Sequence, residues 1–253
     1  METSVRRREI LEKISTEGKV RVADLSERFG TSVVTIRNDL AELEREGLLE
    51  RVHGGAVGTY KSYLAMSFND RMNVNLEAKE RIADELGRLI HPGDTMIFNA
   101  GSTSLLCSRR CFLKQGISIV TNSIVIAGEA RMNKVERVIL LGGMLDGEYQ
   151  FTYGDDTINH VNKYMADKLV MSIDGISASG GITTHHHSEV EVTRAMMSRA
   201  VFKVVVADGS KVGRTGFAAI CPVSEIDLLI TDVSASLEQV AALRKTGLEV
   251  MRI

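Results

Sequence analysis

The feature that most constrains the fold is a unit that recurs along most of the chain. In this unit a short apolar run rich in β-branched residues leads into a polar or glycine-rich turn and then a segment with helical spacing. Examples are "TMIFNAGSTS", "ISIVTNS", "RVILLGGML", "DKLVMSIDGIS", "FKVVVADGS" and "DLLITDVS". Continuous apolar strands that alternate with helices are typical of a parallel sheet covered on both faces. The sequence therefore predicts an α/β domain, which we place at residues 68–253.

Residues 1–57 follow a different pattern, which predicts three short helices and a hairpin. Apolar residues repeat at helical spacing in two segments, residues 6–15 and 22–29, and Gly30 is placed to end the second helix. Ser32 is placed to cap a third helix with a buried stripe of Ile36, Leu40 and Leu43. A helix, a tight turn and a helix form a helix-turn-helix, and "LLERVHGGAV" predicts the hairpin. Residues 58–67 show no period and are predicted to be a linker.

The outer face of the third predicted helix carries small or hydrogen-bonding side chains, namely Val34, Arg37, Asn38 and Ala41. Composition does not by itself indicate nucleic-acid binding, because residues 1–57 contain ten Lys and Arg against eleven Asp and Glu and the whole chain has a net charge of −2. Only the placement of the charges supports it. Two interpretations remain open, a helix that reads bases and a solvated helix of a protein-docking module.

Four polar turns follow predicted strands, at the edge where open α/β sheets bind ligands. They are Asn99–Ser104, Thr121–Ser123, Asp174–Gly175 and Asp208–Arg214. In the first turn Gly101 lets backbone N–H groups approach an anion, and a helix begins with three hydroxyl residues. Lys211 adds a cation, so a phosphate or a carboxylate fits this edge. The alternative is a capping turn without a ligand, and no Gly-Lys-Ser/Thr follows to make a Walker A loop.

We expect no metal and no cofactor. In an extended segment His185, His186 and His187 would point alternately to opposite sides, so at most two of them could bind one metal, and Glu189 is the carboxylate nearby. The run is interpreted as a loop that lines a ligand. The three cysteines have no metal-like spacing and are interpreted as buried or idle thiols.

The sequence also predicts a cytoplasmic protein without membrane contact. No apolar run approaches the roughly 18 residues that span a bilayer. The opening "METSVRRREILEKI" is charged and lacks the apolar core of a signal peptide.

Taken together, these residues resemble the DeoR-type family of bacterial sugar-catabolism repressors, over essentially the whole chain. At the N-terminus the resemblance rests on Arg6, Ile10, Ile14, Ser32, Thr35–Arg37, Asp39–Leu40, Leu43 and "HGGA" at residues 53–56. The C-terminal part is similar to the family's sensor domain, which has the fold of ribose-5-phosphate isomerases, glucosamine-phosphate deaminases and CoA transferases. The matching positions there are Arg71, Lys79, Gly101–Thr103, Thr121–Asn122, Gly142–Gly143, Asp174–Gly175, Glu189, Arg194, Asp208 and Ser210–Lys211.

The resemblance implies a winged helix-turn-helix repressor that binds operator DNA and is released by a phosphorylated sugar. Helix-turn-helix proteins read repeated half-sites, so we expect a homodimer or homotetramer. The expected DNA-binding residues are Ser32, Val34, Thr35, Arg37, Asn38, Arg51 and His53. The expected effector-binding residues are Asn99, Gly101, Ser102, Thr103, Ser104, Thr121, Asn122, Asp174, Glu189, Arg194, Asp208 and Lys211. Asp39 is expected to be structural, because a carboxylate that faced phosphate would repel it.

The chain departs from the family pattern at several positions. Asn38 follows Arg37 where the family often has a second Arg, and Asn99 stands where it usually has Asp. No Arg follows Gly142–Gly143, and His185 and His186 replace residues that are more often aromatic, small or acidic. The last three departures concern the effector, and none of them concerns the fold.

Two alternatives to a repressor remain at this stage. One is a phosphosugar isomerase or deaminase fused to a DNA-binding head, for which Asp174, Glu189 and His187 are candidate general bases. The other is activation or dual control, whose sign depends on where the operator lies.

Overall fold

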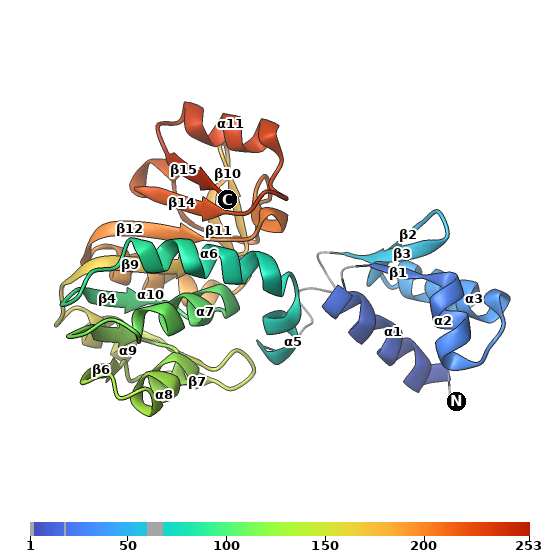
Figure 1. The fold of residues 1–253 in the computed structure, drawn as a ribbon, viewed down its shortest axis with the longest axis horizontal. Coiled ribbons are helices and arrows are strands. Elements are labelled where there is room, and N and C mark those ends of the chain that lie inside the picture. The colour runs from blue at the N-terminus through green and yellow to red at the C-terminus, as the bar shows by residue number, and fades with distance from the viewer. Residues whose placement is uncertain (1–2, 18, 60–67) are drawn as a thin grey trace. The chain divides into compact units, whose positions relative to one another are not determined.

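The computed structural model describes residues 3–17, 19–59 and 68–253. The chain divides into two compact units, residues 1–76 and 77–253, which are described separately here (Figure 1).

The first unit is a helix-turn-helix with a three-stranded wing. Its elements are α1 (Thr3–Glu17), β1 (Lys19–Arg21), α2 (Val22–Phe29), α3 (Val33–Arg45), β2 (Leu49–Val52), β3 (Gly55–Gly58) and α5 (Phe68–Asn73). Strand β3 is the middle strand of the antiparallel sheet β1-β3-β2. The unit has its own apolar core, which includes Ile10, Ile14, Leu25, Ile36, Leu40 and Leu49. The predicted three helices and hairpin are confirmed.

Two local features close the turn between α2 and α3, and both match the predictions. Gly30 has the left-handed φ of 57° and donates its N–H to the carbonyl oxygen of Glu27. Ser32 is the N-cap of α3, and its Oγ accepts a hydrogen bond from the backbone nitrogen of Thr35 at 3.1 Å.

The second unit is built on a seven-stranded sheet with the strand order β15-β14-β12-β9-β4-β5-β6. Every neighbouring pair is parallel. The strands are β4 (Thr95–Phe98), β5 (Ser118–Thr121), β6 (Arg137–Leu140), β9 (Ala166–Ser172), β12 (Ala200–Val206), β14 (Leu228–Thr231) and β15 (Glu249–Arg252). The predicted parallel α/β sheet is confirmed.

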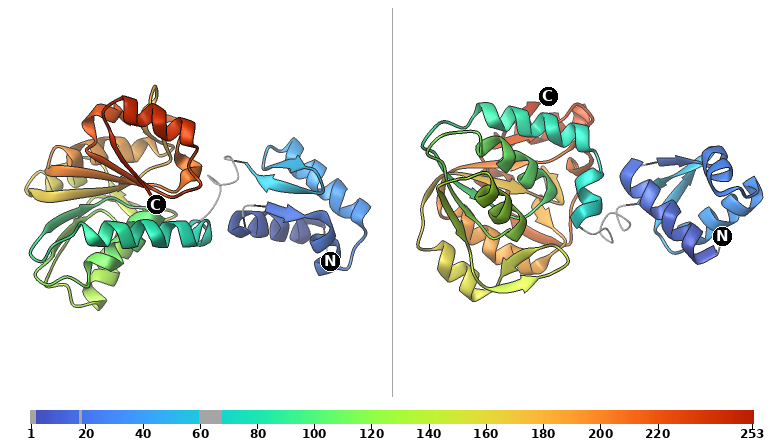
Figure 2. Two further views of the ribbon diagram at one scale, coloured as in Figure 1. Left: turned by 45° about the horizontal axis from the view of Figure 1, so that its top comes forward. Right: turned by 60° about the horizontal axis from the view of Figure 1, so that its bottom comes forward.

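Helices connect these strands and cover the sheet (Figures 1 and 2). They are α6 (Leu76–Arg88), α7 (Ser102–Cys111), α8 (Ile124–Met132), α9 (Asp155–Val161), α10 (His187–Met197) and α11 (Leu237–Lys245). The connections β4-α7-β5 and β5-α8-β6 step in one direction along the sheet, whereas β9-α10-β12 steps in the other. Because parallel crossovers are right-handed, α7 and α8 cover one face of the sheet and α10 covers the opposite face.

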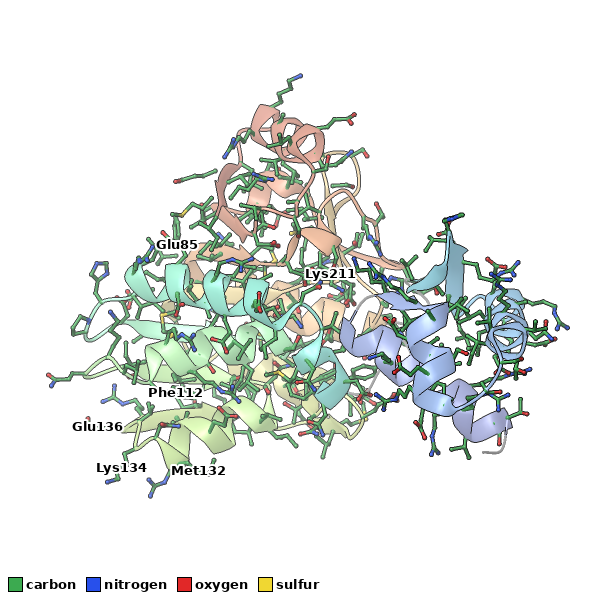
Figure 3. All side chains as sticks on the ribbon, turned by 45° about the vertical axis from the view of Figure 1, so that its right-hand side comes forward. Glu85, Phe112, Met132, Lys134, Glu136 and Lys211 are labelled. Carbon is green, nitrogen blue, oxygen red and sulfur yellow. The ribbon has the colours of Figure 1, made fainter. Side chains whose placement is uncertain are left out.

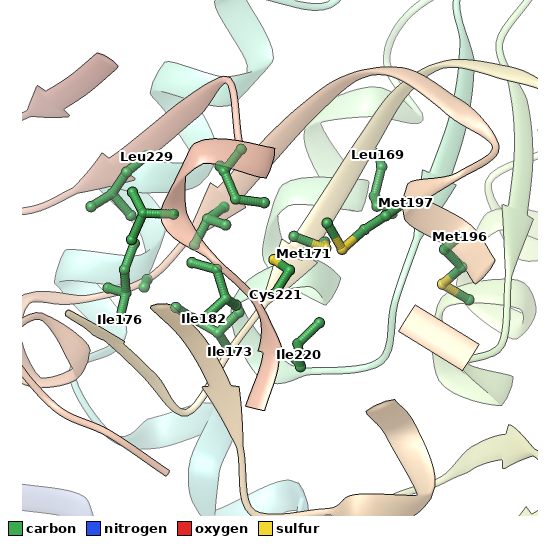
Figure 4. Close-up of a cluster of buried hydrophobic side chains, with 14 of the residues drawn as sticks. Leu169, Met171, Ile173, Ile176, Ile182, Met196, Met197, Ile220, Cys221 and Leu229 are labelled. Carbon is green, nitrogen blue, oxygen red and sulfur yellow. The ribbon is translucent and has the colours of Figure 1, made fainter. Parts of the chain in front are cut away.

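Two small antiparallel sheets complete the unit. Strands β7 (Met144–Asp146) and β8 (Phe151–Tyr153) form a hairpin. Strands β10 (Gly175–Ser177), β11 (Gly181–Thr184) and β13 (Ala218–Cys221) form the other sheet, in that order. A buried cluster joins it to the large sheet, and Figure 4 shows Met171 and Leu169 of β9 near Met197 of α10 and Cys221 of β13.

The sequence pattern missed several details of the fold. It did not predict β1, whose three residues are too short for a period, although β1 pairs with β3 throughout. It treated "RVILLGGML" as one run, but the chain turns at Gly143, where a Cβ would lie 2.0 Å from Thr157 Oγ1. It also treated "DKLVMSIDGIS" as one run, whereas β9 and β10 belong to different sheets. In the described part of the chain, no helix is long and apolar enough to cross a membrane.

Candidate functional site

The candidate ligand site of the second unit lies where the strand order reverses. From β4 the chain builds outward through β5 and β6, and it then returns to place β9 on the other side of β4. The carboxyl ends of β4 and β9 therefore flank a topological switch point, where open α/β sheets bind ligands. Four predicted turns follow β4, β5, β9 and β12 at this edge.

The turn after β4 presents the amino end of α7 to the switch point. Gly101 has φ of 149°, and a Cβ there would lie 2.4 Å from the Cβ of Ser172, so a side chain at this position would collide with β9. The Ser104 N–H donates to Ser172 Oγ at 2.8 Å. Among the described residues, the N–H groups of Ser102 and Thr103 have no hydrogen-bond acceptor. Two backbone donors thus remain at the positive end of a helix, which favours an anion.

Two predicted asparagines tie strand ends together. The Asn99 amide accepts from the Ser172 nitrogen at 2.8 Å and donates to the Ser172 carbonyl oxygen at 2.9 Å, which joins β4 to β9. Asn122 Oδ1 accepts from the Ala100 nitrogen at 3.1 Å, and its Nδ2 donates to the Thr152 carbonyl oxygen. Both side chains are buried and hold the switch point in shape.

A buried polar cluster follows β9, β11 and β12. Lys211 and Asp174 are both buried, and Lys211 Nζ lies 3.9 Å from Asp174 Oδ1. Asp174 Oδ2 also accepts from Thr184 Oγ1 at 3.2 Å and from the His185 nitrogen at 2.9 Å. Thr184 Oγ1 lies 3.2 Å from Glu189 Oε2 as well. The structure therefore brings together Asp174, Glu189 and Lys211, which the sequence had selected separately.

Aromatic side chains from the β7–β8 hairpin meet the histidine run. The rings of Tyr149 and His186 have centroids 4.0 Å apart, and the centroid of buried Phe151 lies 6.4 Å from that of His186. The hairpin also pairs with the end of β5, because the Thr152 nitrogen donates to the Asn122 carbonyl oxygen at 2.8 Å. From the sequence we expected only that the missing Arg after Gly142–Gly143 concerns the effector; neither the hairpin nor its contact with His186 was predicted.

Three other predicted residues have structural partners. Arg194 Nε donates to the Ile220 carbonyl oxygen at 2.7 Å and its Nη2 to the Ala219 carbonyl oxygen at 3.0 Å. Its side chain lines a separate cavity of about 330 Å³ beside β13. Asp208 Oδ1 accepts from the Ser210 nitrogen, and Thr121 Oγ1 accepts from the Ser123 nitrogen, both at 3.0 Å.

A further polar residue at the same edge, Asp232, was not predicted. Asp232 follows β14 and is buried. Its Oδ1 accepts from the Gly209 nitrogen at 2.7 Å, so it fixes the start of the turn that carries Lys211. The signal was present in "DLLITDVS", where an Asp directly follows a buried strand.

The first unit presents its candidate site on the outer face of α3. Val34 is 64% exposed, and Arg37 and Asn38 are exposed too. Buried Asp39 on the inner face pairs with Arg6 Nε at 2.6 Å and Arg7 Nε at 3.1 Å. The hydrogen bond to Asp39 raises the pKa of Arg6 above its usual value. The structural role predicted for Asp39 is confirmed.

The remaining predicted residues of this unit flank α3. The hydroxyls of Ser32 and Thr35 lie 2.9 Å apart at its amino end. Arg51 on β2 donates from Nε to Glu44 Oε2 at 2.7 Å and from its backbone nitrogen to Glu44 Oε1 at 2.9 Å, which joins the wing to α3. These hydrogen bonds lower the pKa of Glu44. His53 is exposed in the turn of the wing.

The described residues contain no group of three or more His, Cys, Asp and Glu side chains that could hold a metal ion. Cys107, Cys111 and Cys221 are buried free thiols. Burial raises the pKa of all three, and that of Cys221 reaches about 12.

Comparison with known families matches both units. Residues 6–61 match the model of the DeoR-like helix-turn-helix domain, and residues 74–233 match that of the DeoR C terminal sensor domain.

Curated relatives match over nearly the whole chain. The HTH-type transcriptional repressor GlcR of Bacillus subtilis (strain 168) is 31% identical over 96% of this chain and 93% of that protein. The HTH-type transcriptional regulator GlpR of Haloferax volcanii is 32% identical over 97% and 96%. The glycerol-3-phosphate regulon repressor of Escherichia coli (strain K12) is 30% identical over 92% of both. All three are named as regulators, and the isomerase or deaminase alternative gains no support from them.

Among solved structures, a D-ribose-5-phosphate isomerase in complex with phospho-erythronic acid has a TM-score of 0.41 and is 15% identical. The match covers 54% of this chain and 53% of that chain.

Proposed function

The chain belongs to the DeoR family of transcriptional regulators, and on that premise we propose that it represses a carbohydrate-catabolism operon and leaves its operator when a phosphorylated sugar binds. The observation that carries the proposal is the switch point. The amino end of α7 and buried Lys211 offer an anion site there, in a chain whose other unit is a winged helix-turn-helix.

For DNA binding, we propose that residues 1–57 form the operator-binding domain and that residues 58–67, which lie largely outside the described residues, link it to residues 68–253. The amino end of α3 would enter the major groove, with Val34, Arg37 and Asn38 facing base edges and Ser32 and Thr35 beside the flanking phosphates. Arg37 would pair with a guanine or a phosphate, and Asn38 would read an adenine. Arg51 and His53 on the wing would contact the backbone.

For effector binding, we propose two subsites. The N–H groups of Ser102 and Thr103, together with Lys211, would hold the phosphate. Asp174 and Glu189, which share the Thr184 hydroxyl, would accept hydrogen bonds from the sugar hydroxyls. Gly101, Ser104, Asn99, Thr121, Asn122 and Asp208 would shape the site. Arg194 would act at a distance, by fixing β13.

Release from DNA would follow from linkage between the two sites. An effector that binds the low-affinity conformation more tightly lowers operator affinity by the same free-energy difference. Couplings of about 1–3 kcal/mol are typical, which corresponds to roughly 5- to 150-fold in affinity. We propose that the protein acts in the cytoplasm as a homodimer or homotetramer, because operators repeat their half-sites.

The test is fluorescence anisotropy of a labelled DNA fragment from upstream of this protein's own gene, with a panel of sugar phosphates and the same sugars without phosphate. We expect specific binding that one phosphorylated sugar weakens and its unphosphorylated form does not. Binding that no phosphorylated sugar changes would contradict the sensor assignment. Conversion of a sugar phosphate into its isomer by the purified protein would revive the enzyme alternative.

A further inference from the structure

The β7–β8 hairpin is a part of the candidate site to which the proposed function gives no role. Its residues 149–152 run along the carboxyl edge of the large sheet, beside the end of β5. The Thr152 nitrogen donates to the Asn122 carbonyl oxygen at 2.8 Å, and Asn122 Oδ1 accepts from the Ala100 nitrogen at 3.1 Å. Ala100 leads directly into the turn that carries the proposed phosphate subsite. One end of the segment is therefore fastened to that subsite.

The other end of the segment meets the carboxylates of the site. The rings of Tyr149 and His186 have centroids 4.0 Å apart and planes inclined at 54°. The His186 nitrogen donates to Thr184 Oγ1 at 3.2 Å. That hydroxyl lies 3.2 Å from both Asp174 Oδ2 and Glu189 Oε2, the carboxylates proposed to bind the sugar hydroxyls. The segment thus joins the two proposed subsites, and its ring contact stands beside the second.

Local hydrogen bonds hold Tyr149 in place. Asp146 Oδ1 accepts from the nitrogens of Glu148 and Tyr149, at 3.1 and 2.9 Å. The next residue, Gln150, has the left-handed φ of 58°, and its carbonyl oxygen accepts from the Ile124 nitrogen at 3.1 Å. A residue other than glycine keeps such a φ only where its surroundings hold it, and ligand clamps are among the places where this occurs.

His186 is held by a second aromatic ring. Phe151 is fully buried, and its ring meets that of His186 edge-on, with centroids 6.4 Å apart. His186 is also the N-cap residue of α10, so its backbone is fixed by the start of that helix. Tyr149 and His186 are themselves half-buried, which leaves ring surface for a ligand. Rings fixed in this way offer apolar contact area at a small cost in conformational entropy.

A sugar phosphate offers two kinds of surface to such a site. Its phosphate oxygens and hydroxyls need charged or hydrogen-bonding partners, which the two subsites supply. Its C–H groups are apolar and pack well against aromatic rings. In the ring form of the sugar these C–H groups gather on the faces of a rigid ring, whereas in an open chain they are spread along a flexible one. An aromatic surface between the subsites therefore favours the ring form.

We propose that Tyr149 and His186 form an aromatic clamp that recognises the ring form of a phosphorylated sugar. This inference rests on the proposed function, because it takes the effector site of that function as given. The phosphate is held at the amino end of α7 and by Lys211, the hydroxyls are held by Asp174 and Glu189, and a C–H face of the sugar packs against the clamp. The effector is thereby narrowed to a cyclic pentose or hexose phosphate.

The test titrates the full-length chain with two matched series of ligands in a calorimeter. One series contains ribose 5-phosphate and the 6-phosphates of glucose, galactose and mannose. The other contains the corresponding alditol phosphates, which keep the phosphate and the number of carbons but cannot close a ring. We expect at least one sugar phosphate to bind the native chain about 10-fold more tightly than its alditol phosphate. Alditol phosphates that bind as tightly as their parent sugars would overturn the proposal.

Variants of the clamp assign this preference to the rings. Tyr149→Leu and His186→Ala each remove one ring, and each is expected to weaken binding of the sugar phosphate by roughly 3- to 10-fold while the affinity for the alditol phosphate stays native. Tyr149→Phe keeps the ring and is expected to keep the preference. Equal losses for both series would show that the two side chains only shape the hairpin. A preference absent from Tyr149→Phe would assign it to the hydroxyl, against the proposal.

Matched controls lie at the opposite edge of the sheet. Phe112 is half-buried like Tyr149 and precedes β5, and His91 is exposed and precedes β4. Figure 3 shows Phe112 and Lys134 on one side of the second unit, well apart from Lys211. Phe112→Leu and His91→Ala are expected to leave the affinities for both series native. Circular dichroism checks that all variants fold.

Operator release separates the clamp from the proposed function. If a sugar phosphate releases the operator from the native chain but Tyr149→Leu and His186→Ala keep the native preference for the ring form, the clamp fails and the sensor stands. If the variants lose the preference but no sugar phosphate changes operator affinity, the clamp stands and the release mechanism fails. If the native chain binds no member of either series, both fail.

Discussion

Each unit of the chain buries a basic side chain near a carboxylate, and the two pairs differ in how closely they approach. In the first unit Arg6 Nε lies 2.6 Å from Asp39 Oδ2, within hydrogen-bond distance. In the second unit Lys211 Nζ lies 3.9 Å from Asp174 Oδ1, beyond it. The close pair fastens α1 to α3 and is suited to a permanent structural role. The wider pair is suited to a lysine that exchanges interactions when a ligand oxygen arrives.

The two candidate sites also differ in how far their side chains are exposed to solvent. Arg37 and Asn38 are exposed on α3, whereas Ser102, Thr103 and Lys211 are each less than 8% exposed. A polyanion as large as DNA is met by an exposed helix, and a small anion is met by buried donors at the end of a sheet. If this distinction holds, a substitution at the effector site will leave operator affinity without effector nearly unchanged. A substitution on the exposed face of α3 will leave effector affinity nearly unchanged.

The largest expected effect comes from breaking the close pair. Asp39→Ala removes the carboxylate from buried Arg6, and such changes cost about 3–5 kcal/mol of stability. We expect fast hydrogen–deuterium exchange in α1 and α3, little change in the strands of the large sheet, and loss of operator binding. Glu27→Ala, at an exposed position on α2, is the control. Native exchange rates in α1 and α3 of the Asp39 variant would show that the pair is dispensable.

The next effect comes from the wider pair. Lys211→Met removes the cation proposed to hold the effector phosphate, and a hydrogen bond to a charged group contributes about 1.5–3 kcal/mol. We expect calorimetry to show roughly 10- to 150-fold weaker binding of the phosphorylated effector. Operator affinity without effector should stay native. Lys163→Met changes an exposed lysine and serves as the control. Equal losses for phosphorylated and unphosphorylated sugars would contradict a phosphate role.

A smaller effect is expected on the exposed helix. Arg37→Ala should lower operator affinity by about 1–3 kcal/mol, the range for one bidentate base contact, and leave effector affinity native. Arg45→Ala, at the carboxyl end of α3, is the matched control. Anisotropy at two salt concentrations measures both. Native operator affinity in the Arg37 variant would overturn the assignment of α3 as the recognition helix.

The sequence predicted best where one short pattern determines the structure. Gly30 and Ser32 act through their own backbone and neighbours, so the helix boundaries followed from local chemistry. The apolar, β-branched runs of the large sheet are buried on both faces, so their pattern indicated parallel strands directly. The role of Asp39 also followed, because a carboxylate on a DNA-facing surface would have been repelled.

What the sequence could not predict depends on residues far apart in the chain. Asn99 and Ser172 are separated by 73 positions, and nothing in either segment shows that the Asn99 amide joins β4 to β9. The contact of Tyr149 with His186 has the same origin. Arg194 was selected by resemblance, and only the fold shows that its guanidinium is bonded to carbonyl oxygens of β13.

The smallest expected effect is that a thiol reagent does not modify the native chain. This experiment tests whether the two units unfold independently. All three cysteines lie in the second unit. Thiol reagents attack the thiolate, and burial raises the pKa of these thiols, to about 12 for Cys221. At pH 8 only about one Cys221 in ten thousand is then ionised. We expect Ellman's reagent to leave the native chain unmodified and to find three thiols in urea.

The same reagent applied to the Asp39→Ala variant reports unfolding of the second unit alone, because the first unit contains no cysteine. If the two units unfold separately, the variant will lose protection in α1 and α3 while its three thiols stay unreactive at pH 8. If its thiols react at the rate seen in urea, unfolding of the first unit opens the second. The burial of the wider Lys211–Asp174 pair would then require the close Arg6–Asp39 pair to be intact. In that case the two sites could not be altered one at a time.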